Sequence, residues 1–213
     1  MSAGVKSVHM IPLTLLIWIF TSCSPESTVS IGLDSTRRSD VIIDNKVFRV
    51  SYNEIFEQPN WLEYVVKDRP KNVDRAGMDF YKESGIHTSD DRDYYNNVWD
   101  KGHMAPAATF SDTYDNLYAT FSFLNCALQY DDLNRVEWAQ LESKEREWAK
   151  KLGDLKVRIE VLFDEQHEIL PTGAHIPTAF TKRIEFPGDS IVCFYFVNDE
   201  PKLKWEESIV DCD

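Results

Sequence analysis

The chain has 213 residues, enough for one well-buried domain but too few for two ordinary ones once its N-terminal segment is set aside. Apolar residues make up 43% of it and aromatic residues 13%, which excludes a disordered polymer and predicts a packed core. The 23 basic and 36 acidic residues give a formal net charge of −13, which argues against nucleic-acid binding through a broad cationic face. Any such binding is expected at a local site and to be weak and salt-sensitive.

The first 22 residues have the pattern of an export signal. Lys6 supplies positive charge before an apolar run at 11–20, which is too short to serve as a permanent membrane anchor. The small residues directly before Cys23 resemble a bacterial lipoprotein cleavage site, which implies that Cys23 becomes the lipidated first residue. The alternative is an ordinary signal peptide. We therefore expect an exported protein, lipid-anchored to a bacterial membrane, on the periplasmic side because no acid-rich export tag follows the cysteine.

Residues 23–40 are polar and without periodicity, as in a tether, so the folded domain is expected at 41–213. Removing the signal leaves Cys126, Cys193 and Cys212, an odd number, and at most one disulfide can form within the chain. Cys193 and Cys212 are a possible pair. The spacing does not fit a cysteine zinc site.

Hydrophobic periodicity predicts the elements of the domain in chain order. We expect strands at 47–52 and 61–66, polar surface loops from 67 to 98, a short helix capped by Ser111 or Asp112 and continuing through Phe121, a longer helix from about 133 to 151 that ends at Gly153, and strands at 156–163, 179–186 and 190–197. Strands followed by helices and then strands predict an α+β domain with a mostly antiparallel sheet.

The segment Asp100-Lys101-Gly102-His103-Met104-Ala105-Pro106 carries the first candidate for catalysis. A histidine beside glycine and a cation can act as a general base on a backbone that approaches a phosphate closely. The alternative is an ordinary surface histidine.

A second group of residues lies on the predicted long helix. Asn134, Glu142 and Arg146 are spaced by eight and four residues, which keeps them broadly on one side of a helix. A neutral amide, a carboxylate and a guanidinium can thus face one small site. The alternatives are that Asn134 only caps the helix and that Glu142 and Arg146 form a surface pair. We expect Trp138 in the core.

Together these motifs resemble the DNA/RNA non-specific endonuclease family, the sugar-non-specific nucleases with a ββα-metal core. That family has Asp-Arg-Gly-His followed by an apolar residue, Ala and Pro, and then a helix that reads Asn-x-x-x-Trp-x-x-Leu-Glu. Residues 176–182 are similar to the family's Val-Pro-Thr-x-Phe-x-Lys strand, so the resemblance covers roughly residues 45 to 200. It implies a histidine loop beside a long metal-binding helix.

The resemblance implies hydrolysis of phosphodiester bonds in DNA and RNA with little sequence specificity. His103 would be the general base, taking a proton from the attacking water. Asn134 would bind one Mg²⁺, for which Mn²⁺ can substitute, and Glu142 would orient the water around that metal.

The same resemblance implies roles for three further polar residues. Lys101 and Arg146 would contact the substrate and stabilise the charge of the transition state. Asn125 would contact the substrate or hold the His103 segment. Lys101 stands where the family has arginine. Lysine carries a point charge and lacks the planar guanidinium with which arginine binds a phosphate through two hydrogen bonds.

Two other functions remain open at this stage. One is a catalytically weakened, lipid-anchored binding protein on the same fold, suggested by Lys101 and the acidic balance, and the other is a phosphodiesterase for small nucleotides. The remaining histidines of the domain, His87, His167 and His175, have no comparable context and are expected to be surface or structural residues. The sequence leaves the oligomeric state undetermined.

Overall fold

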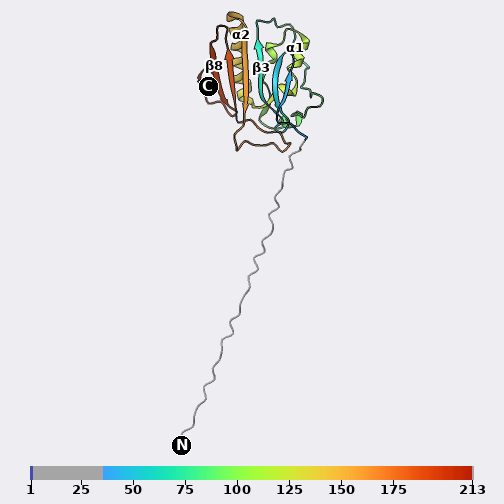
Figure 1. The fold of residues 1–213 in the computed structure, drawn as a ribbon, viewed down its shortest axis with the longest axis vertical. Coiled ribbons are helices and arrows are strands. Elements are labelled where there is room, and N and C mark those ends of the chain that lie inside the picture. The colour runs from blue at the N-terminus through green and yellow to red at the C-terminus, as the bar shows by residue number, and fades with distance from the viewer. Residues whose placement is uncertain (2–35, 213) are drawn as a thin grey trace. The chain divides into compact units, whose positions relative to one another are not determined.

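The structure is a computed structural model that describes Met1 and residues 36–212 (Figure 1). The chain divides into two units, Met1–Gly32 and Leu33–Asp213, and every described element belongs to the second. The expected export signal, the lipidation residue Cys23 and most of the tether therefore lie outside the described residues. Within the part that is described, no helix is long and apolar enough to cross a bilayer.

A seven-stranded sheet forms the centre of the domain, and every neighbouring pair of its strands is antiparallel. In spatial order the strands are β1 (Val41–Asp44), β2 (Phe48–Asn53), β3 (Gln58–Val66), β6 (Leu155–Leu162), β7 (Ala179–Glu185), β8 (Ile191–Val197) and β9 (Ile209–Val210). The expected α+β class with a mostly antiparallel sheet is confirmed. The five strands predicted from periodicity correspond to β2, β3, β6, β7 and β8, with shifted ends.

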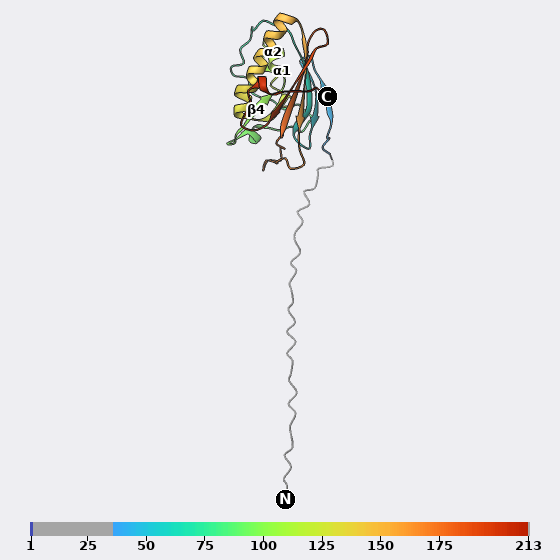
Figure 2. The same ribbon diagram turned by 90° about the vertical axis from the view of Figure 1, so that its left-hand side faces the viewer.

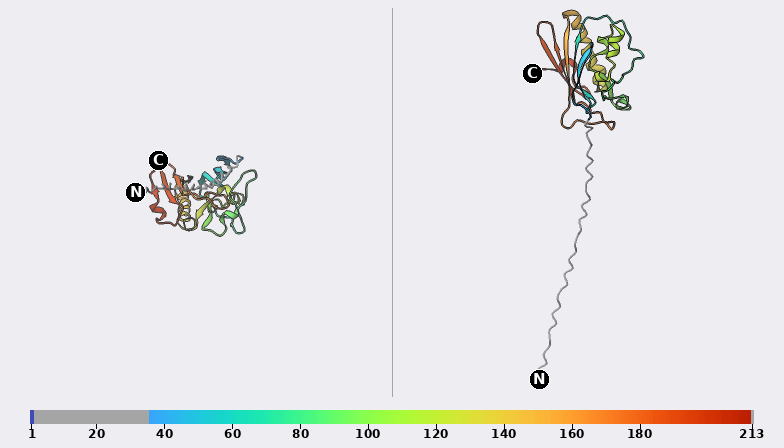
Figure 3. Two further views of the ribbon diagram at one scale, coloured as in Figure 1. Left: turned by 90° about the horizontal axis from the view of Figure 1, so that it is seen from below. Right: turned by 45° about the vertical axis from the view of Figure 1, so that its right-hand side comes forward.

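The helices lie on one side of this sheet. They are η1 (Asp91–Tyr94), η2 (Ala107–Thr109), α1 (Tyr114–Ala119), η3 (Phe123–Asn125), the π-helical turn η4 (Leu133–Trp138), α2 (Ala139–Leu152) and η5 (Trp205–Glu207). Figures 2 and 3 show α1 and α2 on the same side of the strands, and the opposite face carries no helix in the described part of the chain. We call that opposite face the open face.

Alternation along the strands explains this two-sided arrangement. On β6, Val157 and Ile159 are buried towards the helices, whereas Lys156 and Arg158 point to the open face. Trp138 is fully buried and its ring packs 5.6 Å from Phe180 and 5.4 Å from Phe196, measured between centroids. The expectation that Trp138 belongs to the core is confirmed.

Two details of the predicted helices differ. The cap of α1 is Thr113, whose side chain accepts a hydrogen bond from the backbone N–H of Asn116 at 3.2 Å, and so the expected cap at Ser111 or Asp112 is wrong by one or two residues. The long helix starts at Leu133 as expected, but its first six residues are π-helical. It ends at Gly153, whose φ of 104° only glycine adopts readily.

A second, two-stranded sheet carries the histidine motif. Strand β4 (Trp99–His103) pairs antiparallel with β5 (Cys126–Tyr130), and His103 lies opposite Cys126 at the end of the ladder. His103 is therefore the last residue of a strand rather than part of a loop. Periodicity does not reveal β4, because Asp100, Lys101 and Gly102 show no apolar alternation.

The cysteines of the domain have distinct states. Cys193 on β8 forms a disulfide with Cys212, with 5.4 Å between their Cα atoms, and this links the end of the chain to the sheet. Cys126 is a free, buried thiol, and burial raises its pKa to about 12. The pairing that the sequence left open is thus Cys193 with Cys212.

A buried ionic network anchors α2 to the sheet. Lys182 on β7 and Glu145 on α2 are both fully buried, and Lys182 Nζ donates to Glu145 Oε1 at 2.9 Å. Tyr64 on β3 donates its hydroxyl to the other carboxylate oxygen at 2.9 Å. The Lys182 ammonium also lies 3.9 Å from the centroid of the Trp138 ring. This network joins the middle of the helix to two strands.

Candidate active site

A cleft of about 780 Å³ brings the two predicted motifs together. His103 comes from the end of β4, whereas Asn134 and Glu142 come from η4 and α2, and all three line this cleft. Figure 2 shows β4 beside α1 and α2 on the same side of the sheet. Residues 31 and 39 positions apart in the sequence thus share one solvent-connected space, which we call the catalytic cleft.

The His103 imidazole packs against two aromatic rings. Its centroid is 4.7 Å from that of Phe80 and 5.0 Å from that of Phe121. Its Nε2 is buried without a hydrogen-bond partner. Burial, together with the nearby positive charge of Arg75, lowers the pKa of His103 to about 3. The ring is therefore neutral over the physiological range, which is the form that can accept a proton.

Residues behind His103 hold its backbone in place. The Met104 N–H donates to the Asn125 carbonyl at 2.9 Å, and the Asn125 side chain bonds to both the N–H and the carbonyl of Ala105. A Cβ on Gly102 would come within 2.4 Å of Gln129 Oε1, so only glycine allows β4 and β5 to approach this closely. Gly102 and Asn125 together fix the end of β4.

Asn125 is fully buried and does not line the catalytic cleft. Its amide also donates to the Thr120 carbonyl at 2.8 Å, so its donors and its acceptor bind backbone groups. The expected substrate contact by Asn125 is therefore not available in this structure, because the side chain cannot reach a ligand. Its position fits the other suggested role, holding the His103 segment.

Asn134 lies in the π-helical turn that opens the long helix. Its Nδ2 donates to Asp100 at 2.9 Å, which leaves the carbonyl oxygen as the amide atom free to bind a ligand. Asp100 also accepts two hydrogen bonds from Arg135, at 2.8 and 2.6 Å, which hold the carboxylate in position. The helix cap is Asp132, so Asn134 is not merely a capping residue. Single π-helical turns occur frequently at functional sites.

Glu142 faces the same cleft from the first turn of α2. Burial raises the pKa of its carboxyl from 4.5 to about 7, against the opposing charge of Lys182. Among the described residues, no ion pair joins Glu142 to Arg146, so the two do not form the ordinary surface pair considered above. A carboxyl in a cleft whose pKa is raised to about 7 is a candidate functional group.

The shifted pKa of Glu142 makes stability depend on pH. The folded protein binds the proton of the Glu142 carboxyl more tightly than the unfolded chain does. The stabilisation of the fold by this proton is complete below pH 4.5 and is lost as the pH rises through about 7. In chelator, Glu142→Gln should therefore stabilise the fold by about 1–2 kcal/mol at pH 8, and by clearly less at pH 5. Urea unfolding at both pH values measures this, with the exposed Glu206→Gln as the control. Equal differences at the two pH values would contradict the assignment.

Lys101 lines the cleft but is held by two acidic side chains. Its ammonium pairs with Asp91 and, at 3.3 Å, with Asp79. Burial lowers the pKa of Lys101, but the hydrogen bonds that its ammonium donates to Asp91 and Asp79 outweigh this effect, and the net pKa is raised. The lysine therefore stays charged, and part of its charge is compensated before any substrate arrives.

Arg146 lies one turn beyond Glu142 and is not among the residues that line the cleft. Its Nη1 is buried and has no hydrogen-bond partner. Its positive charge lowers the pKa of Glu142 and so opposes the rise that burial causes. The direct contact of Arg146 with a phosphate stays a prediction.

Arg75 is a cation of the cleft that the sequence analysis missed. It lines the cleft, acts on the pKa of His103, and forms no ion pair with any described residue. The sequence shows it only as one of several basic residues in the polar segment 67–98. Its proximity to His103 arises from the fold of that segment.

The other histidines lie outside the cleft. His87 Nε2 contacts Glu57 at 2.7 Å. His167 and His175 contact each other at 2.6 Å, and the His175 ring stacks on Phe56 with centroids 4.2 Å apart. These contacts fit the structural role expected for them.

The donor atoms of the cleft fit a hard divalent cation. An amide carbonyl from Asn134 and a carboxyl from Glu142 are oxygen ligands of the kind that Mg²⁺ binds. No group of three or more His, Cys, Asp or Glu side chains suited to a metal occurs among the residues described. Any ion here would thus keep most of its water ligands, as Mg²⁺ commonly does in proteins.

Comparison with known proteins identifies relatives along most of the chain. The family model described as DNA/RNA non-specific endonuclease matches residues 25–207. Nuclease C1 of Cunninghamella echinulata var. echinulata is 29% identical over 188 residues, which cover 79% of this chain and 74% of that protein. The mitochondrial nuclease of Saccharomyces cerevisiae is 29% identical over 154 residues, covering 62% of this chain and 46% of the relative.

The fold is also similar to that of a solved structure. A chain in the crystal structure of the EndoG/EndoGI complex superposes with a TM-score of 0.73 at 23% sequence identity. The match covers 81% of this chain and 80% of the other. At this level of identity the comparison supports the arrangement of the strands and helices.

Proposed function

The chain belongs to the DNA/RNA non-specific endonuclease family, and from this membership together with the catalytic cleft we propose that it hydrolyses DNA and RNA by a metal-dependent reaction with His103 as the general base. The family and the named nuclease relatives make it a hydrolytic nuclease. One observation carries the finer proposal: His103, Asn134 and Glu142 line the same cleft although they come from separate elements.

The proposed reaction starts with water in the cleft. The neutral His103 ring accepts a proton from this water, and the oxygen attacks phosphorus as the bond to the leaving oxygen breaks. An incoming phosphate brings negative charge next to the ring and raises the pKa of His103 again, which favours the transfer. The aromatic rings of Phe80 and Phe121 keep the imidazole in one orientation.

The proposed metal site consists of few protein atoms. Asn134 would hold Mg²⁺, or Mn²⁺ in its place, through its carbonyl oxygen, and Glu142 would orient the surrounding water. When bound, the ion neutralises charge on the phosphate and on the leaving oxygen. Asp100 prepares the site by binding the amide nitrogen of Asn134, which keeps the carbonyl oxygen available.

Two cations are placed to stabilise the added charge of the transition state. Arg75 lines the cleft without an acidic partner among the described residues, so its guanidinium can bind a phosphate oxygen. Lys101 adds positive charge to the cleft while it is paired with Asp79 and Asp91. Arg146 supports Glu142 through its charge.

Digestion of supercoiled plasmid and of RNA by the full-length protein tests this proposal. Cleavage is expected with Mg²⁺ and should stop in excess chelator. Asn134→Ala should slow cleavage by roughly 100-fold and remove the Mg²⁺-dependent rise in melting temperature, because the metal loses its protein ligand. Gln140→Ala, an exposed amide on the same helix, is the matched control.

Intact plasmid and RNA in the presence of both Mg²⁺ and Mn²⁺ would refute the proposal. Hydrolysis of bis-nitrophenyl phosphate without cleavage of either polymer would instead favour a phosphodiesterase for small nucleotides. Unchanged metal dependence in Asn134→Ala would place the ion elsewhere.

A further inference from the structure

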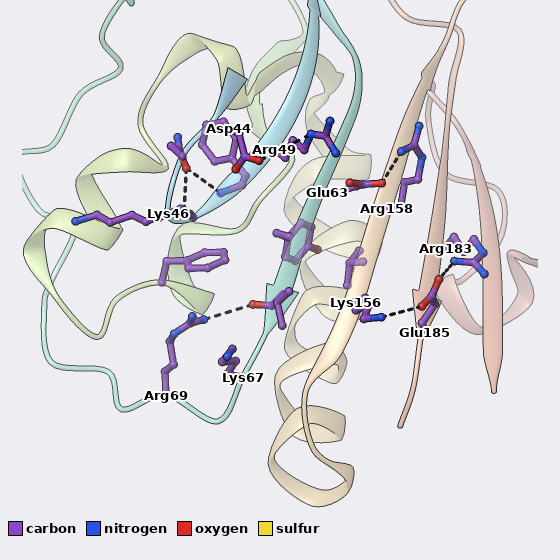
Figure 4. Close-up of a pocket in the computed structure, with 17 residues that line it drawn as sticks. Asp44, Lys46, Arg49, Glu63, Lys67, Arg69, Lys156, Arg158, Arg183 and Glu185 are labelled. Atoms are coloured by element: carbon purple, nitrogen blue, oxygen red, sulfur yellow. Dashed lines mark hydrogen bonds and ion pairs between the residues drawn. The ribbon is translucent and has the colours of Figure 1, made fainter. Parts of the chain in front are cut away.

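The open face of the sheet holds a second hollow, of about 550 Å³, which we call the basic groove (Figure 4). Three acidic residues line it, namely Asp44, Glu63 and Glu185. Seven basic residues also line it, namely Lys46, Arg49, Lys67, Arg69, Lys156, Arg158 and Arg183. Close to a third of the chain's 23 basic residues thus gather in one hollow, although the net charge of the chain is −13. Such a local field attracts anions that the rest of the protein repels.

The three acidic residues of the groove pair with four of its seven cations, which leaves an excess of positive charge in the lining: Asp44 contacts Arg49, Glu63 contacts Arg158, and Glu185 contacts Lys156 and Arg183. Glu185 is shared between Lys156 and Arg183, and its oxygen lies 3.8 Å from the Lys156 ammonium (Figure 4). The contact between Arg49 and Asp44 is also long, at 3.9 Å. Exposed pairs of this kind contribute little energy and exchange readily for another anion.

Three lysines of the groove are especially accessible. The side chains of Lys46, Lys67 and Lys156 are 59%, 49% and 77% exposed. The partners of Lys46 and Lys67 are exposed as well, whereas Glu185, the partner of Lys156, is half-buried. Their ammonium groups can therefore bind a phosphate without unfolding any part of the core.

The arginines are held more rigidly, by an aromatic ring on the open face. The Arg158 and Arg49 guanidinium carbons lie 4.3 and 5.8 Å from the centroid of the Trp61 ring. Stacking of this kind fixes a planar guanidinium, which binds phosphate oxygens in pairs. The groove thus combines mobile lysines with positioned arginines.

A path of basic residues on one chain segment leads from the groove towards the catalytic cleft, although the groove and the next hollow share no lining residue. The segment 67–75 supplies Lys67 and Arg69 to the groove, and Lys71 and Arg75 to a neighbouring hollow of about 440 Å³. That hollow shares Arg75, Ala107 and Ala108 with the cleft.

Hydrogen bonds keep this path in place. The Ser111 carbonyl accepts from the backbone N–H groups of Asn72 and Val73, at 2.9 and 3.0 Å. The Arg69 guanidinium lies 4.9 Å from the Phe110 ring. The segment between groove and cleft is therefore tied to the residues next to η2.

We propose that the basic groove binds, through its phosphates, a DNA or RNA strand that extends out of the catalytic cleft. This inference rests on the function proposed for the cleft and adds a second holding site for long substrates. The basic residues of segment 67–75 lie between the groove and the cleft, which favours a strand held in the cleft over a membrane surface as the groove's occupant. Phosphate contacts carry no sequence information, so the groove would lengthen the bound segment without adding specificity.

The test compares two sets of three lysines in the full-length protein. The groove variant is Lys46→Ser/Lys67→Ser/Lys156→Ser, and the control is Lys144→Ser/Lys202→Ser/Lys204→Ser, which removes the same charge outside the groove and the cleft. Fluorescence anisotropy with a labelled single-stranded 40-mer and 6-mer, in chelator, measures binding independently of cleavage.

We expect the groove variant to bind the 40-mer roughly tenfold more weakly at 0.1 M salt, and its salt slope to fall by about 2, as for three lost phosphate contacts on a single strand. The 6-mer should bind as it does to the wild type, since it does not reach the groove. The control should retain the affinity and the salt slope of the wild type for both lengths.

Several outcomes would overturn this inference. The groove variant could bind the 40-mer as tightly as the wild type does, or the control variant could lose as much affinity for it as the groove variant. The wild type could also fail to bind the 40-mer. A loss of binding to phosphatidylglycerol vesicles with unchanged 40-mer binding would assign the groove to a membrane instead. Failure of the wild type to cut plasmid would count against the catalytic proposal alone, because the anisotropy experiment requires no turnover.

Discussion

Replacing His103 with alanine should lower the rate of plasmid cleavage by about 10²- to 10⁴-fold, the usual contribution of a general base. The imidazole is neutral at physiological pH, and its buried Nε2 has no hydrogen-bond partner in the described structure, so this nitrogen can accept a proton. Phe80 and Phe121 cannot take its place as proton acceptors. Initial rates of nicking at saturating Mg²⁺ measure the effect.

The loss should lie in turnover and not in substrate binding. In chelator, His103→Ala should bind a labelled oligonucleotide within about twofold of the wild type, because the phosphate-binding cations remain. His87→Ala is the matched control, since His87 contacts Glu57 outside the cleft. Cleavage by His103→Ala within about threefold of the wild type would exclude His103 as the base.

Replacing Lys182 with methionine should destabilise the fold by about 3–5 kcal/mol, a large part of the stability of an ordinary domain. Lys182 and Glu145 are both fully buried and joined at 2.9 Å. Without the ammonium group, the Glu145 carboxylate stays buried with the Tyr64 hydroxyl as its remaining hydrogen-bond partner. Urea unfolding, with the circular dichroism of the sheet as the signal, measures the difference.

The double variant Lys182→Met/Glu145→Leu is the informative control. It removes both charges, so it should regain much of the stability that the single variant loses. A loss below about 1 kcal/mol in Lys182→Met would show that the buried pair does not hold the helix.

The buried pair also matters for the site. Glu145 lies three residues after Glu142 on α2, so a helix that loosens from β3 and β7 displaces the carboxyl that faces the cleft. In Lys182→Met we therefore expect activity to fall at temperatures below the melting transition. The stability of the core and the geometry of the cleft depend on the same helix.

Local patterns in the sequence predicted much of the fold. Period-two alternation identified β2 and β6, and a continuous apolar run identified β8. On β6 every second side chain is buried against the helix layer. The long helix and its end at Gly153 followed from composition and from the conformational freedom of glycine. The strands β4 and β5 were not predicted, because their ladder contains polar residues and a glycine that interrupt the apolar alternation.

The site could be predicted to a similar extent. The motifs around His103 and Asn134 are short, so their spacing together with the resemblance to the nuclease family brought out their residues. Spacing could not show that Asn125 turns inward to the backbone or that Arg146 lies outside the cleft. Those facts depend on how β5 and α2 pack against other elements.

By itself, the sequence determined the class of fold, the order of most elements and the chemical groups available for catalysis, since these follow from local backbone preferences and from which residues avoid water. Only the tertiary structure decided that Asp100 orients Asn134 across 34 residues, that Arg75 comes near His103, and that Cys193 pairs with Cys212. It also decided that basic residues from separate strands form one groove on an acidic chain. Long-range pairing sets these distances, and no local pattern encodes them.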